Sequence, residues 1–435
     1  MNVTSLKLCK VIDVCWNVQD KQLEISNRLY LGSTVPSTSE PYYTNLSGMR
    51  ENFAFVWNPN QFPRLTPSEK NFSVAMIEGQ PALIMKRYFA SNVMHLFHDE
   101  ILPGSATILH HEDLRKSVSD RLIISIDEVG STETDVMMTW LGQFWRMNNL
   151  QAALRFKNGL SPTQNLDYIC FKEAYIGMDS LSTSWYHYGF EVPQGPIENI
   201  DRELVGKNVR SAVEWIKDEI YKIYDIKYSK LTEIEVKKAL SLLKSNQPSD
   251  KGPVILIASR TRTRLILNES ELKQKLQEAF PSASEIDFIR QETTEIEELI
   301  VKISTATILI GMHGALLALS AFLPPGAVLI ELFPFGIPVI NYTPYKTLAE
   351  LPEMKIKYAA WVNTREDEPF NIGHPERTIY SGGLKGFPES YQNGIKATKT
   401  VPPHRCCYSP FWLFRIFQDT IVNSEEVIEL IKELI

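Results

Sequence analysis

The chain has 435 residues, of which 44% are hydrophobic and 22% are charged, a composition typical of a globular protein with room for about two to three domains. Its formal net charge is −7, and no cluster of Lys and Arg suggests a nucleic-acid or lipid surface. No stretch approaches the ~18 apolar residues of a membrane-spanning helix, and the N-terminus lacks a signal-peptide pattern.

The lack of both patterns would normally indicate the cytosol, but two features argue for a secretory compartment. N-glycosylation sequons are used only in the secretory pathway, and the sequence has sequons at Asn2, Asn45, Asn71, Asn268 and Asn341. There are five cysteines, an odd number, so at least one is free or pairs between chains. These residues alone leave both the cytosol and a secretory compartment open.

The first half of the chain mixes short apolar strands with helices. Strands are predicted at residues 82–85, 121–126, 167–171 and 174–177, and helices at 139–154 and 208–224. The polar segment 245–252 reads as a linker. We therefore expect a domain boundary near residue 245.

After the linker the pattern becomes regular. Strands are predicted at 253–258, 286–289, 306–310 and 327–331, and helices at 269–280, 294–303, 314–322 and within 411–435. Alternating strands and helices predict a parallel α/β domain. Ligands of such domains bind beyond the carboxyl ends of the strands.

Residues 91–104 place two histidines and two acids inside an apolar run. On a helix, Met94, Phe97 and Ile101 would share a buried stripe, while His95 and Asp99 would lie one above the other beside it. His98 would lie next to this pair and Glu100 would point away from it. Pro103 and Gly104 are expected to end the helix.

This cluster is compatible with three roles. His95, His98 and Asp99 could bind a metal such as zinc or manganese, although no distant third ligand is evident. A carboxylate oriented by a neighbouring histidine could instead serve as a general base. The third interpretation is purely structural, a buried histidine satisfied by the helix.

Polar residues follow the predicted strands of the second half. Arg260, Arg262 and Arg264 would suit a diphosphate, because guanidinium groups pair with phosphate oxygens, but a solvated loop is the alternative. Gly311 and Gly314 flank His313 between a strand and a helix, which suits an anion or simply a tight turn. Glu331 ends a strand, where it could accept hydrogen bonds from a ribose or face water. Earlier in the chain, Trp185, Tyr186 and Tyr188 could stack on a sugar or pack at a domain interface.

Taken together, these motifs resemble glycosyltransferase family 61. The resemblance is carried, in order along the chain, by residues 92–103 (NVMHLFHDEILP), 183–190 (TSWYHYGF), 193–196 (PQGP), 259–261 (SRT), 264–269 (RLILNE), 312–315 (MHGA), 331–334 (ELFP), 342–348 (YTPYKTL), 404–407 (HRCC), 412–415 (WLFR) and 418–420 (QDT).

The resemblance implies an α/β protein of GT-B architecture, with two Rossmann-like domains facing an interdomain cleft. Residues 1–245 would form the acceptor-side domain that carries the base, and residues 246–410 the nucleotide-sugar domain. Residues 411–435 would form a helix packing back on the first domain. The family also implies an N-terminal membrane anchor and a C-terminal fibronectin type III module, neither of which is recognisable in the sequence.

The implied activity is an inverting transfer of GlcNAc from UDP-GlcNAc, in β-1,4 linkage, to O-linked mannose on an α-dystroglycan-type glycoprotein in the endoplasmic reticulum lumen. No metal or other cofactor is expected. Expected partners are UDP-GlcNAc, an O-mannosylated glycoprotein and a second copy of the chain in a homodimer, but not nucleic acid.

The family pattern His-x-x-x-Asp falls on His95 and Asp99, so it implies that Asp99 takes the acceptor proton or orients His95 to do so. The resemblance assigns the remaining roles residue by residue. Donor-binding residues would be Arg260, Arg264, His313, Gly314, Ala315, Glu331 and Phe333, and acceptor-side residues Arg87, His98, Trp185 and Tyr186.

Arg262 departs from the family pattern. Two other functions remain open: transfer of GlcNAc directly to Ser or Thr of EGF-type domains, and a non-catalytic glycan-binding relative.

Overall fold

The computed structural model describes two compact units, Met1–Thr183 and Ser184–Ile435. The described residues are 9–17, 22–25, 42–45, 54–57, 74–77, 81–85, 92–115, 122–125, 147–149, 167–178, 182–183, 185–187, 195–226, 230–245, 247–250, 252–402, 405 and 409–435.

The boundary between the units lies about sixty residues before the linker from which the sequence predicted it. The helix α6 (Arg202–Ile223) belongs to the second unit, where it packs on α9 (Ile296–Thr305) and η4 (Ala315–Phe322). Arg210 on α6 donates to the Met354 carbonyl at 2.6 Å. Tertiary packing therefore outweighs the polar composition of residues 245–252 in defining the domain.

The first unit is built on a mixed seven-stranded sheet of order β2-β1-β9-β6-β7-β8, with β5 also pairing with β9. Its strands are β1 (Cys9–Asn17), β2 (Gln22–Ile25), β5 (Val74–Ile77), β6 (Ala82–Met85), β7 (Leu122–Ser125), β8 (Met147–Asn149) and β9 (Tyr168–Ile176). A separate hairpin joins β3 (Tyr42–Asn45) to β4 (Ala54–Trp57).

The sequence predicted the strand at 82–85 and, within a residue at each end, the strand at 121–126. Two predictions were wrong. Residues 167–171 and 174–177 form one continuous strand, β9, and residues 147–149 are a strand inside the predicted helix 139–154. β8 pairs with β7, so long-range pairing overrides the helical pattern of this segment.

Cys15 and Cys170 form a disulfide between facing positions of β1 and β9, across 155 residues of sequence. Both side chains are buried. Replacing both with Ser is expected to lower the free energy of unfolding by about 2–5 kcal/mol, because the unfolded chain would lose a long covalent loop. Urea titration of the chain with and without reductant measures this difference.

Reductant should lower the midpoint of the native chain and leave the double variant unchanged. Equal midpoints for the native chain with and without reductant would contradict a stabilising role for this disulfide.

The second unit contains a parallel five-stranded sheet of order β13-β12-β14-β15-β16. The strands are β12 (Val254–Ser259), β13 (Glu285–Arg290), β14 (Ile308–Met312), β15 (Val328–Phe333) and β16 (Lys357–Val362). Numbered along the chain this is the order 2-1-3-4-5, so the topological switch point lies between β12 and β14. The prediction of a parallel α/β domain is confirmed, although β16 was not predicted.

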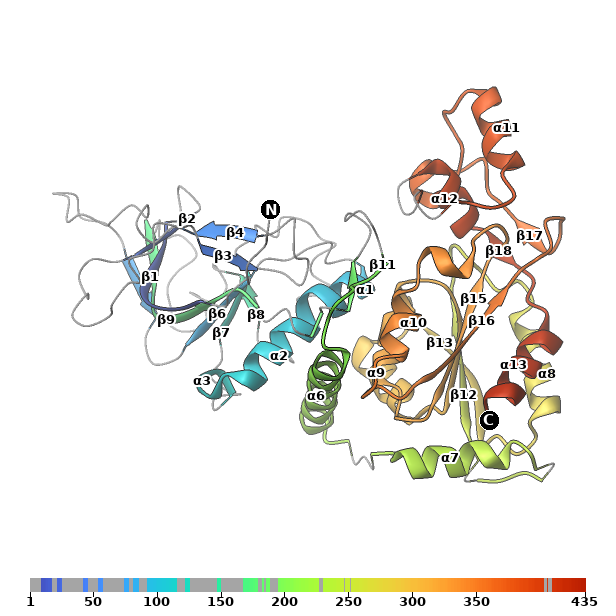
Figure 1. Ribbon diagram of the computed structural model, residues 1–435, viewed down its shortest axis with the longest axis horizontal. Coiled ribbons are helices and arrows are strands. Elements are labelled where there is room, and N and C mark those ends of the chain that lie inside the picture. Colours follow the sequence, from blue (N-terminus) through green and yellow to red (C-terminus); the bar gives the residue numbers. More distant parts are fainter. Residues whose placement is uncertain are drawn as a thin grey trace. The chain divides into compact units, whose positions relative to one another are not determined.

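Helices cover both faces of this sheet (Figure 1). One face carries α8 (Glu269–Ala279) and α13 (Ser424–Leu434), and the other carries α9 and α10 (Pro344–Ala349).

Two helices of the second unit differ from the sequence prediction. α7 (Glu233–Leu242), which was not predicted, begins with a capping box at Thr232. Residues 314–322, predicted as an α-helix, form the 3₁₀ helix η4.

Smaller elements complete the second unit. They are β10 (Tyr186–His187), β11 (Gly195–Pro196), η5 (Val339–Asn341), β17 (Asn371–Ile372), η6 (Ile379–Ser381), α11 (Glu389–Ala397), α12 (Pro410–Ile416) and β18 (Asp419–Thr420). In Figure 1, α11 and α12 extend beyond the end of the sheet.

The C-terminal helix α13 belongs to the second unit. α13 packs against α8, β15 and β16, with Val427 and Ile431 fully buried. Its apolar residues recur at helical spacing, so they cover the apolar sheet face beside them.

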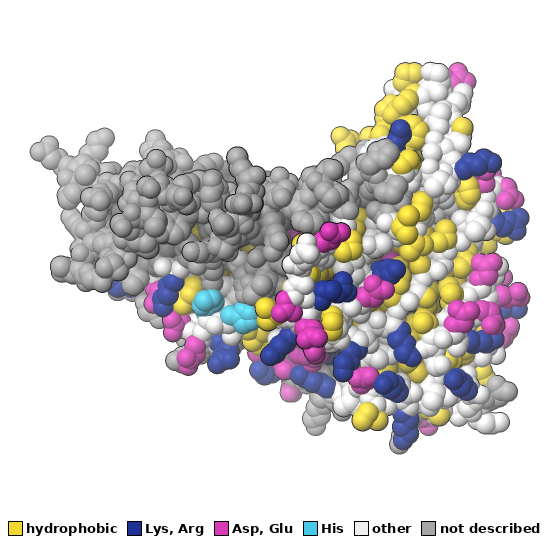
Figure 2. Space-filling model, viewed as in Figure 1, with side chains coloured by type: hydrophobic (Ala, Val, Ile, Leu, Met, Phe, Trp, Pro, Cys, Tyr) yellow, Lys and Arg dark blue, Asp and Glu magenta, His cyan; other side chains and the backbone are white. Residues whose placement is uncertain are grey.

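No helix among the described residues is both long and apolar enough to cross a membrane. On the face of the second unit shown in Figure 2, acidic and basic side chains are interspersed.

Candidate functional site

The helix that carries His95 and Asp99 is continuous through Pro103 and contains a π-helical segment. α1 (Val93–His95) leads into η2 (Leu96–Ile101) and then α2 (Leu102–His110), and the Leu102 amide donates to the Phe97 carbonyl. The prediction that Pro103 ends the helix was wrong. Proline is tolerated here because it occupies the first turn of α2, after the wider π turn.

The segment is also buried on all sides. Met94, Phe97 and Ile101 are buried as predicted, but so are His98, Asp99 and Glu100. The polar groups of this segment are therefore enclosed together with its apolar side chains, and their hydrogen bonds must be made within the fold. π-Helical turns within helices occur frequently at functional sites.

Asp99 lies at the centre of a buried His–Asp–His cluster. Its Oδ2 lies 2.7 Å from Nδ1 of His95, and its Oδ1 lies 2.5 Å from Nδ1 of His98. Burial alone would raise the pKa of Asp99, but the hydrogen bonds from His95 and His98 outweigh it and hold the pKa below its ordinary value. Asp99 is therefore an ionised acceptor that orients both imidazoles.

His95 is the more accessible member of the pair. Its side chain is 11% exposed, whereas that of Asp99 is 0% exposed. Because Nδ1 faces Asp99, Nε2 points away from the carboxylate. This arrangement can hold an imidazole in one tautomer for proton transfer.

Among the described residues, no group of three or more His, Cys, Asp and Glu side chains converges at metal-ligating positions.

Two arginines of the second unit converge on Gly314. The loop after β12 carries Arg260 and Arg264, and β14 is followed by His313 and Gly314. β12 and β14 are neighbours, with Ala258 opposite Gly311, so their carboxyl ends meet at the switch point of the sheet. A Cβ atom at Gly314 would lie 2.9 Å from Nη1 of each arginine.

Glycine is required at two positions here. At Gly311, a Cβ atom would lie 2.7 Å from that of Ala258, so glycine allows β14 to pack closely beside β12. At Gly314, the missing side chain leaves room for the two guanidinium groups.

The guanidinium group of Arg264 is held by a backbone carbonyl and an aromatic ring rather than by a carboxylate. Its Nη1 donates to the His313 carbonyl at 2.8 Å, and its guanidinium lies 4.8 Å from the ring centroid of Phe417. Its backbone has a left-handed φ of 57°, and the next amide, that of Leu265, donates to Asp419 Oδ1 at 2.9 Å. Asp419 therefore stabilises the turn that presents Arg264.

The arginine pair is positively charged, and burial lowers the pKa of Arg260 more than the nearby charge of Glu292 raises it. Burial, and then the charge of Arg260, lowers the pKa of Arg264 to about 9, so at neutral pH it remains a cation. Burial likewise lowers the pKa of Arg260. Within the described part of the chain, no carboxylate forms a salt bridge with either side chain, and the buried Nε of Arg264 has no hydrogen-bond partner. These features suit an anion such as a diphosphate.

The start of η4, beside the arginines, offers fewer backbone amides to an anion than the sequence predicted. The His313 amide donates to the Leu332 carbonyl at 2.8 Å and is not available to an anion. The amides of Gly314 and Ala315, at the start of η4, remain the backbone candidates.

Glu331 and Phe333 lie beside His313 and are fully buried. Glu331 accepts hydrogen bonds from Nδ1 of His313 at 2.5 Å and from the Tyr358 hydroxyl at 2.6 Å. Phe333 stacks on the His313 ring at 5.1 Å between centroids. Direct contact of either residue with uridine would require rearrangement, so the structure shows them supporting His313.

Trp185 and Tyr186, predicted as acceptor-side residues, are buried in the second unit. The Tyr186 hydroxyl accepts a hydrogen bond from the Thr343 amide at 3.0 Å, and its ring lies 5.8 Å from that of Tyr342. Burial raises the pKa of Tyr186 to about 12, so it stays neutral. Both rings therefore pack against other aromatic side chains of the second unit.

Several predicted residues cannot be placed. Arg87, Tyr188, Asn2 and Asn71 lie outside the described residues, and at Asn45 and Asn341 only the backbone is described.

Asn268 uses its side-chain amide internally. Its Nδ2 donates to the Val422 carbonyl and its Oδ1 accepts from the Val422 amide, both at 2.9 Å. Asn268 is the residue before the first turn of α8, but its side chain does not cap the helix.

Three residues that the sequence did not single out complete the second unit's site: Tyr345, Tyr358 and Asp419. Tyr345 packs on His313 with ring centroids 5.5 Å apart. Tyr345 and Asp419 lie in the motifs 342–348 and 418–420, which could have drawn attention to them. Tyr358 lies on the unpredicted strand β16, so no sequence signal marked it.

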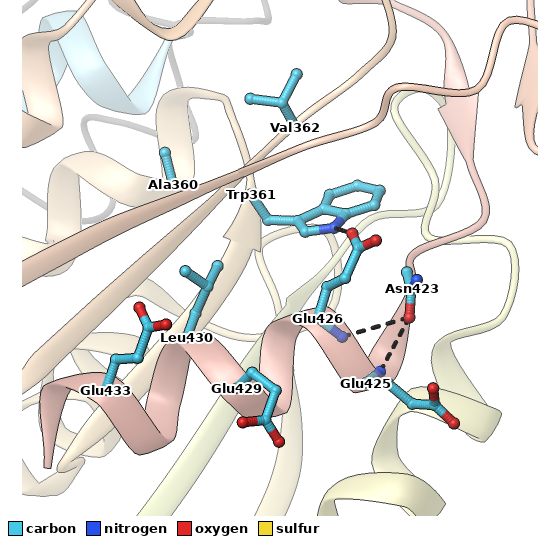
Figure 3. Close-up of a pocket in the computed structure, with 9 residues that line it drawn as sticks. All are labelled: Ala360, Trp361, Val362, Asn423, Glu425, Glu426, Glu429, Leu430 and Glu433. Carbon is cyan, nitrogen blue, oxygen red and sulfur yellow. Dashed lines mark hydrogen bonds between the residues drawn. The ribbon is translucent and has the colours of Figure 1, made fainter.

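A separate cavity of about 600 Å³ lies between β16 and α13 (Figure 3). Glu425, Glu426, Glu429 and Glu433 line it, and Glu426 accepts a hydrogen bond from the Trp361 indole at 2.6 Å. Its acidic lining would repel a nucleotide diphosphate. None of the predicted site residues lines this cavity.

The comparisons with known proteins agree with the sequence motifs. Residues 143–330 match the family model described as Glycosyltransferase 61, which includes the arginine loop and Gly314. A solved structure of a family 9 glycosyltransferase from Veillonella parvula DSM 2008 aligns over 82% of this chain and 96% of that chain. Its identity is only 9% and its TM-score 0.25, a likeness too weak to define the fold.

Much closer relatives are curated proteins named protein O-linked-mannose beta-1,4-N-acetylglucosaminyltransferase 2. The chain is 32% identical to the Xenopus tropicalis protein over 98% of this chain and 67% of the relative, and 33% identical to the Xenopus laevis protein over 99% and 67%. It is 32% identical to the human protein over 81% of this chain, but spans only 54% of that relative's length. The identity to proteins of this name extends over nearly the whole chain, and we conclude that the chain belongs to glycosyltransferase family 61.

Proposed function

We propose that the protein is an inverting glycosyltransferase that moves GlcNAc from UDP-GlcNAc, in β-1,4 linkage, to O-linked mannose on a glycoprotein. The family membership supports a glycosyl transfer, and the names of the relatives suggest the donor sugar and the acceptor. The single structural observation that carries the donor side is the convergence of Arg260 and Arg264 on Gly314 at the switch point of a parallel sheet.

In this proposal the arginine pair holds the diphosphate of the donor. As the glycosidic bond breaks, negative charge grows on the leaving diphosphate, and fixed cations stabilise that charge without reorganising. The amides of Gly314 and Ala315 add backbone donors beside them.

His95 would accept the proton of the attacking mannose hydroxyl, and Asp99 would orient it. The buried carboxylate has both oxygens engaged and a lowered pKa, which makes it a weak base. His95 is the more exposed of the two side chains, at 11% against 0% for Asp99, so an acceptor hydroxyl can reach it more readily. The GT-B architecture with an interdomain cleft is the part of this proposal that rests on the family resemblance.

The secretory location is likewise proposed. The Cys15–Cys170 disulfide supports it, because disulfides persist mainly in oxidising compartments. Residence in the endoplasmic reticulum lumen and a homodimeric state remain expectations from the resemblance.

The test is transfer of labelled GlcNAc from UDP-GlcNAc to two peptides that differ only in an O-linked mannose. The proposal expects labelling of the mannosylated peptide alone and release of the label by β-N-acetylhexosaminidase. Labelling of the unmannosylated peptide, or of a folded EGF-type domain, would favour the alternative acceptor. Absence of transfer with intact UDP binding would favour a non-catalytic glycan-binding relative.

We also expect the reaction to proceed without a divalent cation. Treatment with EDTA, followed by assay in metal-free buffer, should leave most of the activity, because the arginines supply the positive charge at the diphosphate. Activity that disappears with EDTA and returns only with Mn²⁺ would show that this expectation is wrong and would revive the metal role of His95, His98 and Asp99.

A further inference from the structure

Glu331 has both carboxylate oxygens occupied inside the protein. Nδ1 of His313 lies 2.5 Å from Oε1, and the Tyr358 hydroxyl donates to Oε2 at 2.6 Å. The side chain of Glu331 is 0% exposed and that of His313 is 3% exposed. A strand-end carboxylate in this state offers no surface to a ribose.

We infer that Glu331 and Tyr358 are positioning residues for the diphosphate site, acting through His313, rather than ribose ligands. This inference rests on the proposed function, because it assigns the arginine pair to a diphosphate.

The contacts form a continuous path across the sheet. Tyr358 on β16 holds Glu331 on β15, which holds the ring of His313 after β14. The His313 carbonyl in turn accepts from Nη1 of Arg264 at 2.8 Å. Phe333 also stacks on the His313 ring, so the imidazole has little freedom to turn.

The carboxylate also fixes the chemistry of the imidazole. Accepting from Nδ1 assigns a proton to that nitrogen, which keeps the ring in one orientation and in turn holds the backbone of His313. Because Gly314 is the next residue, movement of His313 would displace both the Arg264 anchor and the backbone against which the guanidinium groups pack.

A comparison of the affinities for UDP and for uridine distinguishes a positioning role of Glu331 from direct contact with the ribose. In the Glu331→Gln variant, we expect affinity for UDP to fall about tenfold, the usual effect of losing a hydrogen bond to a charged group, while affinity for uridine stays unchanged. Calorimetry measures UDP binding and ligand-detected NMR measures uridine binding. Equal losses for both ligands would assign Glu331 to the ribose and overturn the inference, as would no loss for either.

The Tyr358→Phe variant provides an independent test, because it removes only the hydroxyl that holds Glu331. It should weaken UDP in the same direction and again spare uridine. In the double variant that carries both Tyr358→Phe and Glu331→Gln, the loss of UDP affinity should be smaller than the sum of the two single losses, because both substitutions act on one path. Full additivity, or no effect of Tyr358→Phe, would contradict the path.

Two matched controls report general damage to the second unit. Glu426→Gln alters an exposed carboxylate that accepts from the Trp361 indole at 2.6 Å, and Tyr221→Phe removes a buried hydroxyl that bonds Ser304 at 2.6 Å. Both should leave UDP affinity unchanged. If these controls weaken UDP as much as the test variants, the role of Glu331 is merely structural.

Inorganic pyrophosphate distinguishes failure of this inference from failure of the proposed function. If the native protein binds pyrophosphate but not UDP, the proposed donor is wrong, and Glu331→Gln should still weaken pyrophosphate about tenfold. If Arg264→Met leaves pyrophosphate binding intact, the anion site itself is wrong and the inference falls with it.

Discussion

The Asp99→Asn variant is expected to transfer GlcNAc about 10²- to 10⁴-fold more slowly than the native protein, with unchanged affinity for UDP-GlcNAc. Asparagine keeps the shape of the side chain but offers one acceptor and one donor where the carboxylate offers two acceptors. At least one of the two imidazoles bonded to Asp99 must then change its tautomer or turn away. The measurement is kcat with a mannosylated peptide, together with the Kd of UDP-GlcNAc.

The pH dependence separates the two candidates for the base. If Asp99 itself took the proton, its lowered pKa would keep it ionised, and kcat/KM would stay level down to acid pH. If a histidine takes the proton instead, kcat/KM should fall at less acid pH, because histidine loses its basic form at a higher pH than a carboxylate with a lowered pKa does. His95→Gln should then be as inactive as Asp99→Asn.

The ionisation of Asp99 should also make the stability of the fold depend on pH. Because the folded-state pKa of Asp99 is lowered, its ionised form stabilises the fold above the pKa of the unfolded chain, and this contribution disappears as the pH falls through the folded-state pKa. The stability difference between native protein and Asp99→Asn should therefore shrink at acid pH.

Thr107→Val is a matched control on the same helix, because it removes a buried hydroxyl that donates to the Pro103 carbonyl at 2.8 Å. It should cost about 1 kcal/mol of stability and leave kcat unchanged. If Asp99→Asn retains more than a few per cent of the native rate with native donor affinity, the cluster is structural.

The Arg264→Met variant is expected to lower kcat/KM about 10²- to 10³-fold, because it removes one of the two cations that converge on Gly314. UDP should bind far more weakly, so the thermal stabilisation that saturating UDP gives the native protein should largely disappear. Steady-state kinetics and thermal denaturation with and without UDP measure the two effects.

The ligand-free variant should be nearly as stable as the native protein. Loss of the hydrogen bond to the His313 carbonyl destabilises it, whereas removal of a buried charge next to Arg260 relieves the repulsion and desolvation that lower the pKa of Arg264. We expect the free energy of unfolding to change by no more than about 1 kcal/mol.

Arg262→Met is the control on the same loop. Arg262 is exposed, and the contact made by its backbone carbonyl, which accepts from Arg377, survives the substitution. Its kinetics should match the native protein. If Arg262→Met is as damaging as Arg264→Met, the general charge of the loop matters rather than the geometry at Gly314.

The sequence by itself determined the parallel α/β unit and the short strand-end motifs of the donor site. Buried parallel strands are continuous apolar runs with loops at fixed ends, so Arg260, Arg264 and Gly314 could be assigned to one edge of one sheet. The spacing of His95 and Asp99 likewise predicted their pairing, because residues four apart on a helix are neighbours.

Only the tertiary structure decided how these groups are used. Burial on every side of the helix, and a π turn that accommodates Pro103, enclose Asp99 between His95 and His98, which local periodicity could not show. Glu331 is buried, and one of its oxygens accepts from Tyr358, a residue on a strand that joins the sheet through non-local pairing. The physical reason is the same in both cases: a carboxylate's role depends on which distant groups desolvate it and satisfy its oxygens, and those contacts exist only in the folded chain.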